Sequence, residues 1–298
     1  MNDTFNRRTT TEEVTHGLNL AGQTIVVTGV NSGLGFETLR ILAKRGAHVV
    51  GLARTVEKAQ QACSQVEGDT TAIACELSDL ESVIAASESI ASQFSKVDVL
   101  ICNAGIMAPT EHRQRYGLEM QFLTNHIGHY LLIRKLEPLL KNASSARVVI
   151  TSSDGHVNAP KAGIDFDNLS AEQNYNAWKC YGQSKLANIL CAKFLAEEFA
   201  NSSIAVNALH PGVINTNLAR DTGGLMTGVI KLFAPLFERS IEQGAATQVY
   251  LAVHPGCSGI SGEYFSNCRI ARPSRHARDE ALAQRLKGVS DDIIASYV

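Results

Sequence analysis

The stretch TIVVTGVNSGLG at residues 24–35 joins an apolar run to a glycine-rich turn. It continues into a helix-like run from Phe36 to Arg45. Glycines allow a sharp turn and let a pyrophosphate reach the backbone, where the N–H groups and dipole of a helix N-terminus favour negative charge. An ordinary strand–helix turn is the alternative. The pattern predicts a dinucleotide phosphate site formed by Gly29, Asn31, Ser32, Gly33, Leu34 and Gly35.

Outward from this stretch, short apolar runs alternate with longer amphipathic runs. This alternation is typical of a parallel sheet with crossover helices, and no linker or internal repeat interrupts it. We expect a single doubly wound Rossmann-type α/β domain over residues 20–298, with about seven parallel strands and helices on both faces. The expected strands are Thr24–Thr28, His48–Ala53, Thr71–Cys75, Val97–Cys102, Arg147–Thr151, Ile204–Leu209 and a late one near Glu263–Ser266.

Residues 1–19 form an N-terminal extension ahead of this domain. Within it, Thr10–Gly17 resembles a short helix, with Thr10 or Thr11 as N-cap and Glu13 in the first turn. We therefore expect one capped turn of helix to lead into the first strand.

The composition argues against several partner classes. The chain of 298 residues has 27 basic and 29 acidic side chains and a net charge of -2, which gives no field for steering onto nucleic acid. Met1–Gly17 is polar and lacks the apolar stretch of a signal peptide or membrane anchor. The seven cysteines are scattered, and His126 and His129 have no third ligand at useful spacing. We expect a cytoplasmic protein without an integral membrane segment or metal, acting on a small molecule.

The end of the second expected strand bears on the choice of cofactor. An acidic residue there would hold the ribose 2′-hydroxyl of NAD. Here residues 51–54 read GLAR, and no carboxylate appears before Glu57. The planar guanidinium of Arg54 can bind a 2′-phosphate, although a solvated arginine at a strand end is the alternative. We predict NADP(H).

Tyr181 and Lys185 are four residues apart and share one face if their segment is helical. Such a pair can perform acid–base chemistry if positive charge lowers the pKa of the phenol from about 10, with Lys185 and the nicotinamide ring as candidate sources. Tyr175 and Lys179 satisfy the same spacing, but they lie in a polar stretch. An apolar helical stripe follows Tyr181, so we predict Tyr181 as the proton donor or acceptor and Tyr175 as a decoy.

Two serines, Ser152 and Ser153, follow the fifth expected strand. That position is the carboxyl edge, where open α/β sheets bind ligands. Either hydroxyl could bind a substrate carbonyl oxygen and stabilise its developing negative charge, although a strand-end serine more often acts as a cap.

Together these motifs resemble the short-chain dehydrogenase/reductase family. The spacing T-G-x-x-x-G-x-G begins at Thr28. The later motifs follow in the family's order: N-A-G, an asparagine, a serine, Y-x-x-x-K and P-G. The resemblance covers nearly the whole chain, residues 20–266. It implies an oxidoreductase that interconverts a carbonyl compound and an alcohol with a nicotinamide cofactor.

The resemblance also implies a role for each matched residue. Ser153, rather than Ser152, aligns with the substrate-binding serine. Asn125 aligns with an asparagine whose backbone carbonyl holds a water that links Lys185 to solvent. The implied cofactor contacts are Glu76 and Leu77 at the adenine, Asn103, Ala104 and Gly105 beside the adenosine, Tyr181 and Lys185, and Pro211, Gly212, Val213 and Thr216 at the nicotinamide.

The runs NHIGH at residues 125–129 and YGQSKLAN at residues 181–188 resemble the branch that holds retinol dehydrogenases, WW-domain-containing oxidoreductases and plant plastid relatives. Vertebrate retinol dehydrogenases commonly carry a membrane anchor, which we do not expect here, so a retinoid substrate is not carried over. Residues 215–240 are apolar and follow the sixth strand, where the family commonly has a lid. A lid would favour a lipophilic substrate, and a packed amphipathic helix is the equal alternative.

The expected function is therefore NADP(H)-dependent interconversion of a lipophilic aldehyde or ketone and its alcohol. A homo-oligomer, dimer or tetramer, is a further expectation, because family members often assemble through the long helices of the Asn125 and Tyr181 segments. The alternative is a regulatory or scaffold protein that binds NADP(H) with little turnover. Competent residues at all four catalytic positions argue against that alternative: Tyr181, Lys185, Ser153 and Asn125.

Overall fold

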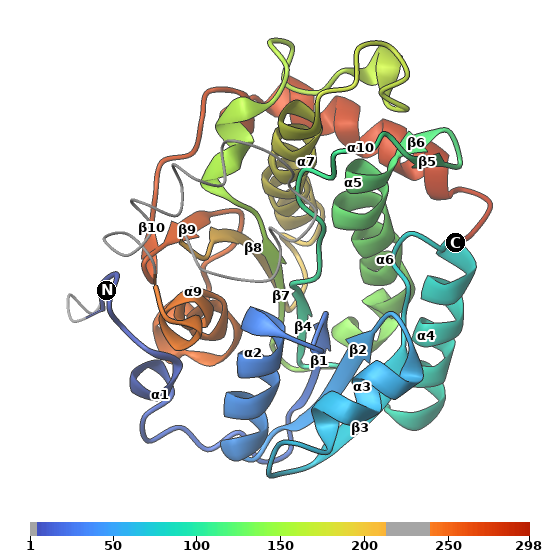
Figure 1. Cartoon of the computed structure of the whole chain (residues 1–298). Helices are drawn as coiled ribbons and strands as arrows, with labels where there is room; N and C mark the ends of the chain where they lie inside the picture. The colour runs from blue at the N-terminus through green and yellow to red at the C-terminus, as the bar shows by residue number, and fades with distance from the viewer. Residues whose placement is uncertain (1–4, 213–238) are drawn as a thin grey trace.

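A computed structural model describes residues 5–212 and 239–298. Its centre is an eight-stranded sheet with the order β10-β9-β8-β7-β4-β1-β2-β3 (Figure 1). Seven of these strands run parallel, and β10 pairs antiparallel with β9. The strands are β1 (Thr24–Thr28), β2 (His48–Ala53), β3 (Thr70–Ala74), β4 (Val99–Cys102), β7 (Ala146–Thr151), β8 (Ile204–His210), β9 (Tyr264–Ser266) and β10 (Arg269–Ile270).

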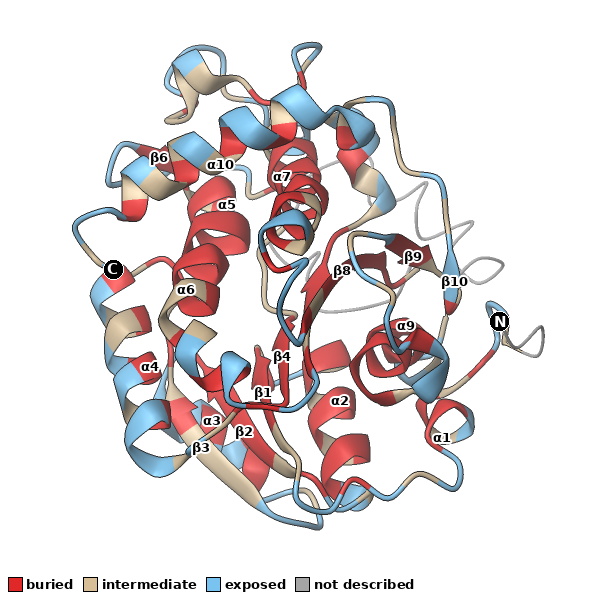
Figure 2. Cartoon of the chain, turned by 180° about the vertical axis from the view of Figure 1, so that it is seen from behind, coloured by how far each residue is buried: buried red, intermediate tan, exposed pale blue. Residues whose placement is uncertain are grey.

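Helices cover both faces of the sheet, and Figure 2 shows the central strands and the inner helix faces buried, while β3 is intermediate and β10 exposed. On β1, Ile25 and Val27 pack into one core cluster, whereas Val26 packs into the other. Both faces are thus apolar, which explains why the strands read as continuous apolar runs. The first cluster includes α2 (Gly33–Lys44), α3 (Val56–Cys63) and α9 (Ile241–Val253), and the second includes α4 (Leu80–Gln93), α6 (Gly128–Lys141) and α7 (Ala177–Glu198).

The strand order reverses beside β1, because β2 and β4 lie on its two sides. In open α/β sheets, the carboxyl edge at such a reversal is where ligands bind. The ends of β1, β4, β7 and β8 meet at this edge, and the glycine-rich turn and the residues after each strand lie there.

The N-terminal extension contains the expected turn of helix, α1 (Thr11–Val14). Thr10 is its N-cap, and its side chain and that of Glu13 form a reciprocal capping box. Glu12 accepts hydrogen bonds from Lys44 and Arg45 at 2.7 Å each, so the extension is held against the end of α2.

Several elements differ from the sequence-based expectation. The bounds of β1 and β2 are those expected, and those of the other five expected strands differ by one or two residues. The short strand β10 and a hairpin of β5 (Gln114–Arg115) and β6 (Leu118–Glu119) were not predicted, because a two-residue strand carries no recognisable period. The proposed lid at residues 215–240 lies almost wholly outside the described residues. Across the two described ranges, no helix is both long and apolar enough to cross a membrane.

The C-terminal helix α10 (Glu280–Ile294) packs across α7 and across η1 (Leu123–Ile127), a π-helical stretch before α6 (Figures 1 and 2). Residues 121–133 and 181–192 are all buried within the single chain. The central parts of these long helices therefore leave no exposed face for the oligomer contact that the resemblance implied.

Candidate active site

The glycine-rich turn lies between β1 and α2. Gly29 and Gly33 have φ values of 75° and 58°, a region in which side chains are strained. A Cβ on Gly35 would overlap the carbonyl oxygen of Gly29 and lie 2.6 Å from Asn103 Nδ2. Ser32 caps α2 without a side-chain hydrogen bond, and the first turn contains no acidic residue. The N–H groups of this helix end can therefore bind an anion.

The N-A-G turn after β4 packs against the glycine-rich turn. Asn103 Nδ2 donates to the Thr28 carbonyl at 2.8 Å. The backbone N–H groups of Asn103 and Ala104 both donate to Thr28 Oγ1 at 2.9 Å. A Cβ on Gly105 would lie 3.5 Å from Lys185 Nζ. This turn thus connects the glycine-rich turn with the interior end of the site.

The residues predicted at the adenosine end lie at the ends of the neighbouring strands. Arg54 directly follows β2 and is exposed. Glu76 follows β3, and its Oε1 accepts hydrogen bonds from the backbone and hydroxyl of Ser78 at 3.1 and 2.9 Å. Leu77, the other residue predicted at the adenine, is buried, and of the residues predicted at the phosphates Asn31 is exposed and Leu34 is buried.

Tyr181 and Lys185 lie one turn apart on α7, and both are buried. Lys185 Nζ lies 5.8 Å from the centre of the Tyr181 ring and donates to the Thr151 carbonyl at 3.1 Å. Burial lowers the pKa of Lys185 to about 8. Burial also raises the pKa of Tyr181, and a hydrogen bond with the Ser153 side chain opposes this rise. In the protein without cofactor, desolvation therefore raises the pKa of the phenol, and the lowering expected from Lys185 together with the nicotinamide ring stays a prediction.

The two serines after β7 have different contacts. Ser152 is buried, and its Oγ donates to the Lys185 carbonyl at 2.7 Å. Ser153 Oγ accepts a hydrogen bond from the Gly155 N–H at 3.0 Å and interacts with Tyr181. Ser152 therefore anchors α7, and Ser153 is the serine beside the phenol.

Tyr175 lies outside this group. It precedes α7, and its hydroxyl donates to the Pro109 carbonyl at 2.6 Å. Lys179, its partner in spacing, is exposed. The structure therefore brings Tyr181, and not Tyr175, together with a buried lysine and a serine.

Asn125 lies within η1 and is fully buried. Its Nδ2 donates to Ser184 Oγ at 2.9 Å and to the Ile106 carbonyl at 3.0 Å, while its Oδ1 accepts from the Ile106 N–H at 2.8 Å. Its own carbonyl lies 3.0 Å from His129 Nδ1. The water that the resemblance assigns to this carbonyl stays a prediction. Among the residues that the structure describes, no group of three or more His, Cys, Asp or Glu could hold a metal ion.

Two glycines without a predicted role fix the position of α7. A Cβ on Gly155 would lie 2.8 Å from the Tyr181 ring, and one on Gly182 would lie 2.5 Å from the Ala159 nitrogen. The 3-10 turn η2 (Asp154–Asn158) therefore packs directly against the catalytic-site helix. Because a glycine inside a helix lowers the stability of the helix, Gly182 in the sequence could have indicated a close packing contact of this helix.

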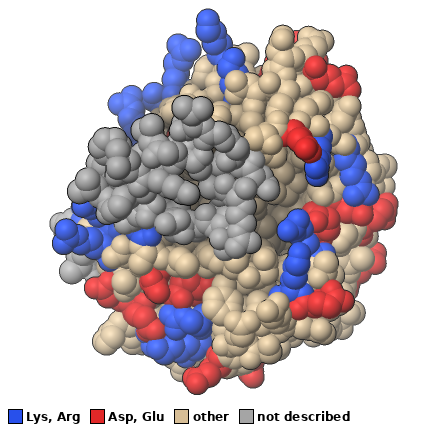
Figure 3. Space-filling view, viewed as in Figure 1, with Lys and Arg blue, Asp and Glu red and all other residues tan. Residues whose placement is uncertain are grey.

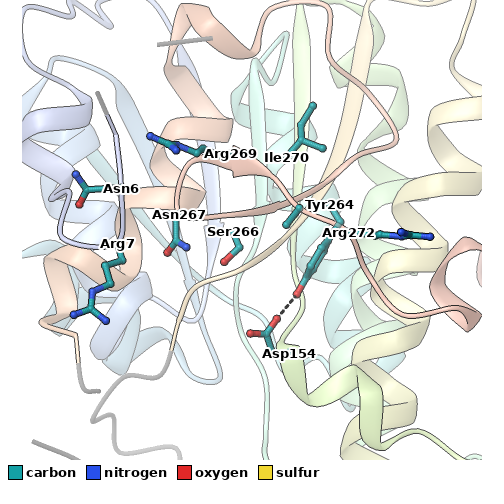
Figure 4. A pocket seen from close by; sticks show the side chains of 10 residues that line it. Asn6, Arg7, Asp154, Tyr264, Ser266, Asn267, Arg269, Ile270 and Arg272 are labelled. Carbon is teal, nitrogen blue, oxygen red and sulfur yellow. Dashed lines mark hydrogen bonds between the residues drawn. The ribbon is translucent and has the colours of Figure 1, made fainter. Parts of the chain in front are cut away.

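Asp154, the neighbour of Ser153, connects η2 with β8 and β9. Its carboxylate accepts a hydrogen bond from the Tyr264 hydroxyl at 2.9 Å and lies 3.1 Å from His210 Nε2 (Figure 4). No spacing in the sequence indicates this cluster, because its members are far apart in the chain. A polar pocket of about 620 Å³ adjoins it, lined among others by Asn6, Arg7, Ser266, Asn267 and Arg272.

Pro211 and Gly212 follow β8, and Gly212 has a φ of 97°. Arg239 donates to the Pro211 carbonyl at 3.3 Å and also to the Asn267 side chain. The loop predicted at the nicotinamide thus begins at the same edge as Ser153. Val213 and Thr216, which were predicted to follow in this loop, lie outside the described residues.

Comparison of the sequence with known proteins shows which family the chain belongs to. A family model described as short chain dehydrogenase matches residues 23–165 and 167–224. This chain belongs to the short-chain dehydrogenase family. It is 34% identical over 304 residues to short-chain dehydrogenase TIC 32 B, chloroplastic, of Brassica napus, a match that covers 98% of this chain and 95% of that protein. It is 35% identical over 294 residues to retinol dehydrogenase 14 of Homo sapiens, which covers 92% and 86% of the two chains.

A solved structure gives the same result for the fold. The short-chain dehydrogenase described here is similar to the crystal structure of a protein from Mycobacterium paratuberculosis, with a TM-score of 0.77 and 31% identity. The match covers 95% of this chain and 97% of the other. The doubly wound α/β fold and the resemblance to the retinol dehydrogenase and plastid branch are confirmed.

Short-chain dehydrogenases are oxidoreductases that use NAD(H) or NADP(H) with small-molecule substrates. The residues present fit such a dinucleotide. Gly29 and Gly35 leave no room for side chains, and the N-terminus of α2 is open to a pyrophosphate. Figure 3 shows Lys and Arg interspersed with Asp and Glu on the described surface of the face in view, without a field of one sign.

Proposed function

We propose that this chain is an NADP(H)-dependent oxidoreductase that interconverts an aldehyde or ketone and its alcohol, with Tyr181 as the general acid and base. One observation carries the proposal: a buried phenol, a serine hydroxyl and a buried lysine meet beyond the carboxyl end of β7, on the same edge of the sheet as the glycine-rich turn. Asn125 joins the same group through Ser184. Each member of the catalytic set is thus present in one place.

The contacts support a division of labour during reduction. Ser153 Oγ already accepts from the Gly155 N–H, so its own proton can be donated to a substrate carbonyl oxygen. Burial raises the pKa of Tyr181, so the phenol holds its proton at neutral pH and can give it to the same oxygen. NADPH, when bound, supplies the hydride for the carbonyl carbon. Lys185, with its pKa lowered to about 8, can return a proton toward the phenol through a water.

The preference for NADP(H) over NAD(H) rests on Arg54. It follows β2, whose neighbours β1 and β3 carry the glycine-rich turn and Glu76 at the same edge. The end of β2 itself contains no carboxylate that would repel a 2′-phosphate, because residues 51–54 read GLAR. An arginine fork matches a phosphate in both charge and geometry.

A lipophilic substrate is supported by the apolar sequence of residues 215–240, which follow the nicotinamide loop. Most of the side chains that line the pocket beside Asp154 are polar or charged, so this pocket by itself does not favour a lipophilic ligand. All seven cysteines are free and six are buried, which supports a reducing compartment such as the cytoplasm, where NADPH favours reduction.

The test is to follow carbonyl-dependent oxidation of NADPH, by its absorbance, over a panel of aliphatic, aromatic and isoprenoid aldehydes and ketones. The same panel with NADH measures the cofactor preference. We expect turnover with at least one lipophilic carbonyl compound and weaker turnover with NADH. Tight NADPH binding without any turnover would contradict the proposal and would favour a cofactor-binding regulatory protein.

A further inference from the structure

His129 is a buried polar side chain that the mechanism above does not use. It lies in the first turn of α6 and is 2% exposed. Its Nε2 lies 2.9 Å from Thr28 Oγ1, and its Nδ1 lies 3.0 Å from the carbonyl oxygen of Asn125. One ring therefore touches both the residue that begins the glycine-rich turn and the backbone of Asn125.

The hydrogen bonds of Thr28 determine which nitrogen of this ring carries the proton. Thr28 Oγ1 accepts from two backbone N–H groups of the N-A-G turn, at 2.9 Å each, which uses both of its lone pairs. It can then only donate, and Nε2 of His129 is nearer than the Ile101 carbonyl, which lies at 3.4 Å. Nε2 is therefore unprotonated, and a neutral ring donates from Nδ1 to the Asn125 carbonyl.

The environment of the ring agrees with a neutral imidazole. Burial lowers the pKa of His129 to about 4, and the nearby charge of Lys185 acts in the same direction. A doubly protonated ring would also point an Nε2–H at Thr28 Oγ1, which has no remaining lone pair to accept it.

From Asn125 the network continues to the catalytic helix. Asn125 Nδ2 donates to Ser184 Oγ at 2.9 Å, and Ser184 Oγ donates to the Tyr181 carbonyl at 2.8 Å. A continuous path of hydrogen bonds therefore runs from Thr28 through His129 and Asn125 to α7. The path links residues whose sequence positions give no sign of contact.

We propose that His129 is a positioning residue whose neutral Nδ1–H tautomer sets the cofactor turn and the catalytic helix relative to each other. The Nε2 arm aligns Thr28, and with it the N-A-G turn that faces the cofactor. The Nδ1 arm holds the Asn125 carbonyl, and through Asn125 it orients Ser184 and α7. The inference deepens the proposed function and rests on it for the kinetic part of its test.

Two substitutions test the hydrogen bonds of Nε2 and Nδ1 separately. In His129→Asn, the amide nitrogen takes the place of Nδ1 and can still donate to the Asn125 carbonyl, but nothing reaches Thr28. In His129→Gln, the longer amide reaches toward Thr28, but the bond to Asn125 is lost. Loss of one buried hydrogen bond typically changes an equilibrium or rate constant by about tenfold. We therefore expect His129→Asn mainly to raise the Kd for NADPH by about tenfold, and His129→Gln mainly to lower kcat by about tenfold.

His126 provides the matched control. It is 1% exposed in the preceding turn, but its Nε2 contacts Ser290 Oγ on α10 at 2.9 Å. His126→Asn and His126→Gln should lower thermal stability and should leave the Kd for NADPH and the kcat close to those of wild type. If the His129 variants behave like these controls, His129 only packs the interior and the proposal is wrong.

A third measurement does not depend on turnover. Nuclear magnetic resonance of the chain labelled with ¹⁵N-histidine should show His129 as the Nδ1–H tautomer throughout the neutral pH range, without titration. An Nε2–H tautomer, or a ring that titrates near neutrality, would overturn the inference. If wild type binds NADPH but reduces no carbonyl compound, the proposed function fails, while the tautomer and the Kd of His129→Asn still decide the role of His129.

Discussion

Lys185 is buried, and its pKa is lowered to about 8. In the unfolded chain the side chain is solvated, and lysine titrates near 10.5. The folded state thus disfavours the charged form, fully so below pH 8 and less as the pH rises toward 10.5. Lys185→Met should raise the free energy of unfolding at neutral pH by at most about 3 kcal/mol while strongly reducing turnover. The Thr151 carbonyl keeps a 3.0 Å hydrogen bond from Asn188, so no buried acceptor is left alone.

Urea unfolding at neutral and at alkaline pH checks this prediction. Wild type should gain stability between pH 8 and 10.5 relative to Lys185→Met, because only wild type relieves a buried charge in that window. Equal or lower stability of the variant at neutral pH would show that Lys185 is not desolvated as described.

The proposed preference for NADP(H) rests on a single residue, Arg54. Arg54→Gln should weaken NADPH binding by about 10- to 100-fold, the usual value of a charge-assisted hydrogen bond, and should leave NADH binding nearly unchanged. Lys58→Gln is the control, because Lys58 is also exposed and lies one turn along α3. Fluorescence titration with both cofactors gives the four constants, and an equal effect of the two variants would point to general charge attraction instead.

The residues that the sequence identified are those whose roles depend on local spacing. The glycine-rich turn and Tyr181 could be predicted because each lies at a strand end or on one helix face, whereas Ser153 was chosen over Ser152 only through the family resemblance. The links from His129 to Thr28 and from Asp154 to Tyr264 and His210 could not be assigned, since they join segments that only folding brings together. The raised pKa of Tyr181 in the protein without cofactor could not be predicted either, because burial is a property of the packed structure.

At the scale of elements, the position of α7 depends on the contact between Gly182 and η2. Gly182→Ala should lower the stability by about 1 to 3 kcal/mol and reduce kcat, because the new methyl group would press on the Ala159 backbone and shift α7. Gly288→Ala on α10 is the matched control, since a Cβ there meets nothing within 4 Å. It should raise stability by about 0.5 to 1 kcal/mol. Thermal unfolding of both variants tests whether Gly182→Ala lowers the stability while Gly288→Ala raises it.

The sequence predicted the elements with a clear period better than those without one. The apolar runs of the parallel strands and the capped helix α1 were found at nearly their observed bounds. The π-helical stretch η1 was expected as ordinary helix, because an i to i+5 bond leaves the apolar pattern almost unchanged. Within this stretch the side chain of Asn125 bonds to Ile106 and Ser184, contacts that only the folded chain brings together.

At the scale of the whole molecule, α10 covers the helices that were expected to form an oligomer interface. His126 bonds to Ser290 of α10, and the Tyr130 hydroxyl bonds to Asp291. Since residues 121–133 and 181–192 are already buried, we expect the chain to be a monomer by size-exclusion chromatography with light scattering. A stable tetramer would require either another surface or displacement of α10.

Tyr181 is the proposed proton donor and acceptor of an NADP(H)-dependent reaction. The most direct test compares carbonyl-dependent NADPH oxidation by wild type, Tyr181→Phe and Tyr175→Phe, with the Kd for NADPH measured for each. We predict that Tyr181→Phe lowers kcat by about 10²- to 10⁴-fold with little change in the Kd, because only the acid–base group is removed. Tyr175→Phe, which loses only a hydrogen bond to Pro109, should stay within a few-fold of wild type, on the order of one weak hydrogen bond. Undiminished turnover by Tyr181→Phe would contradict the account.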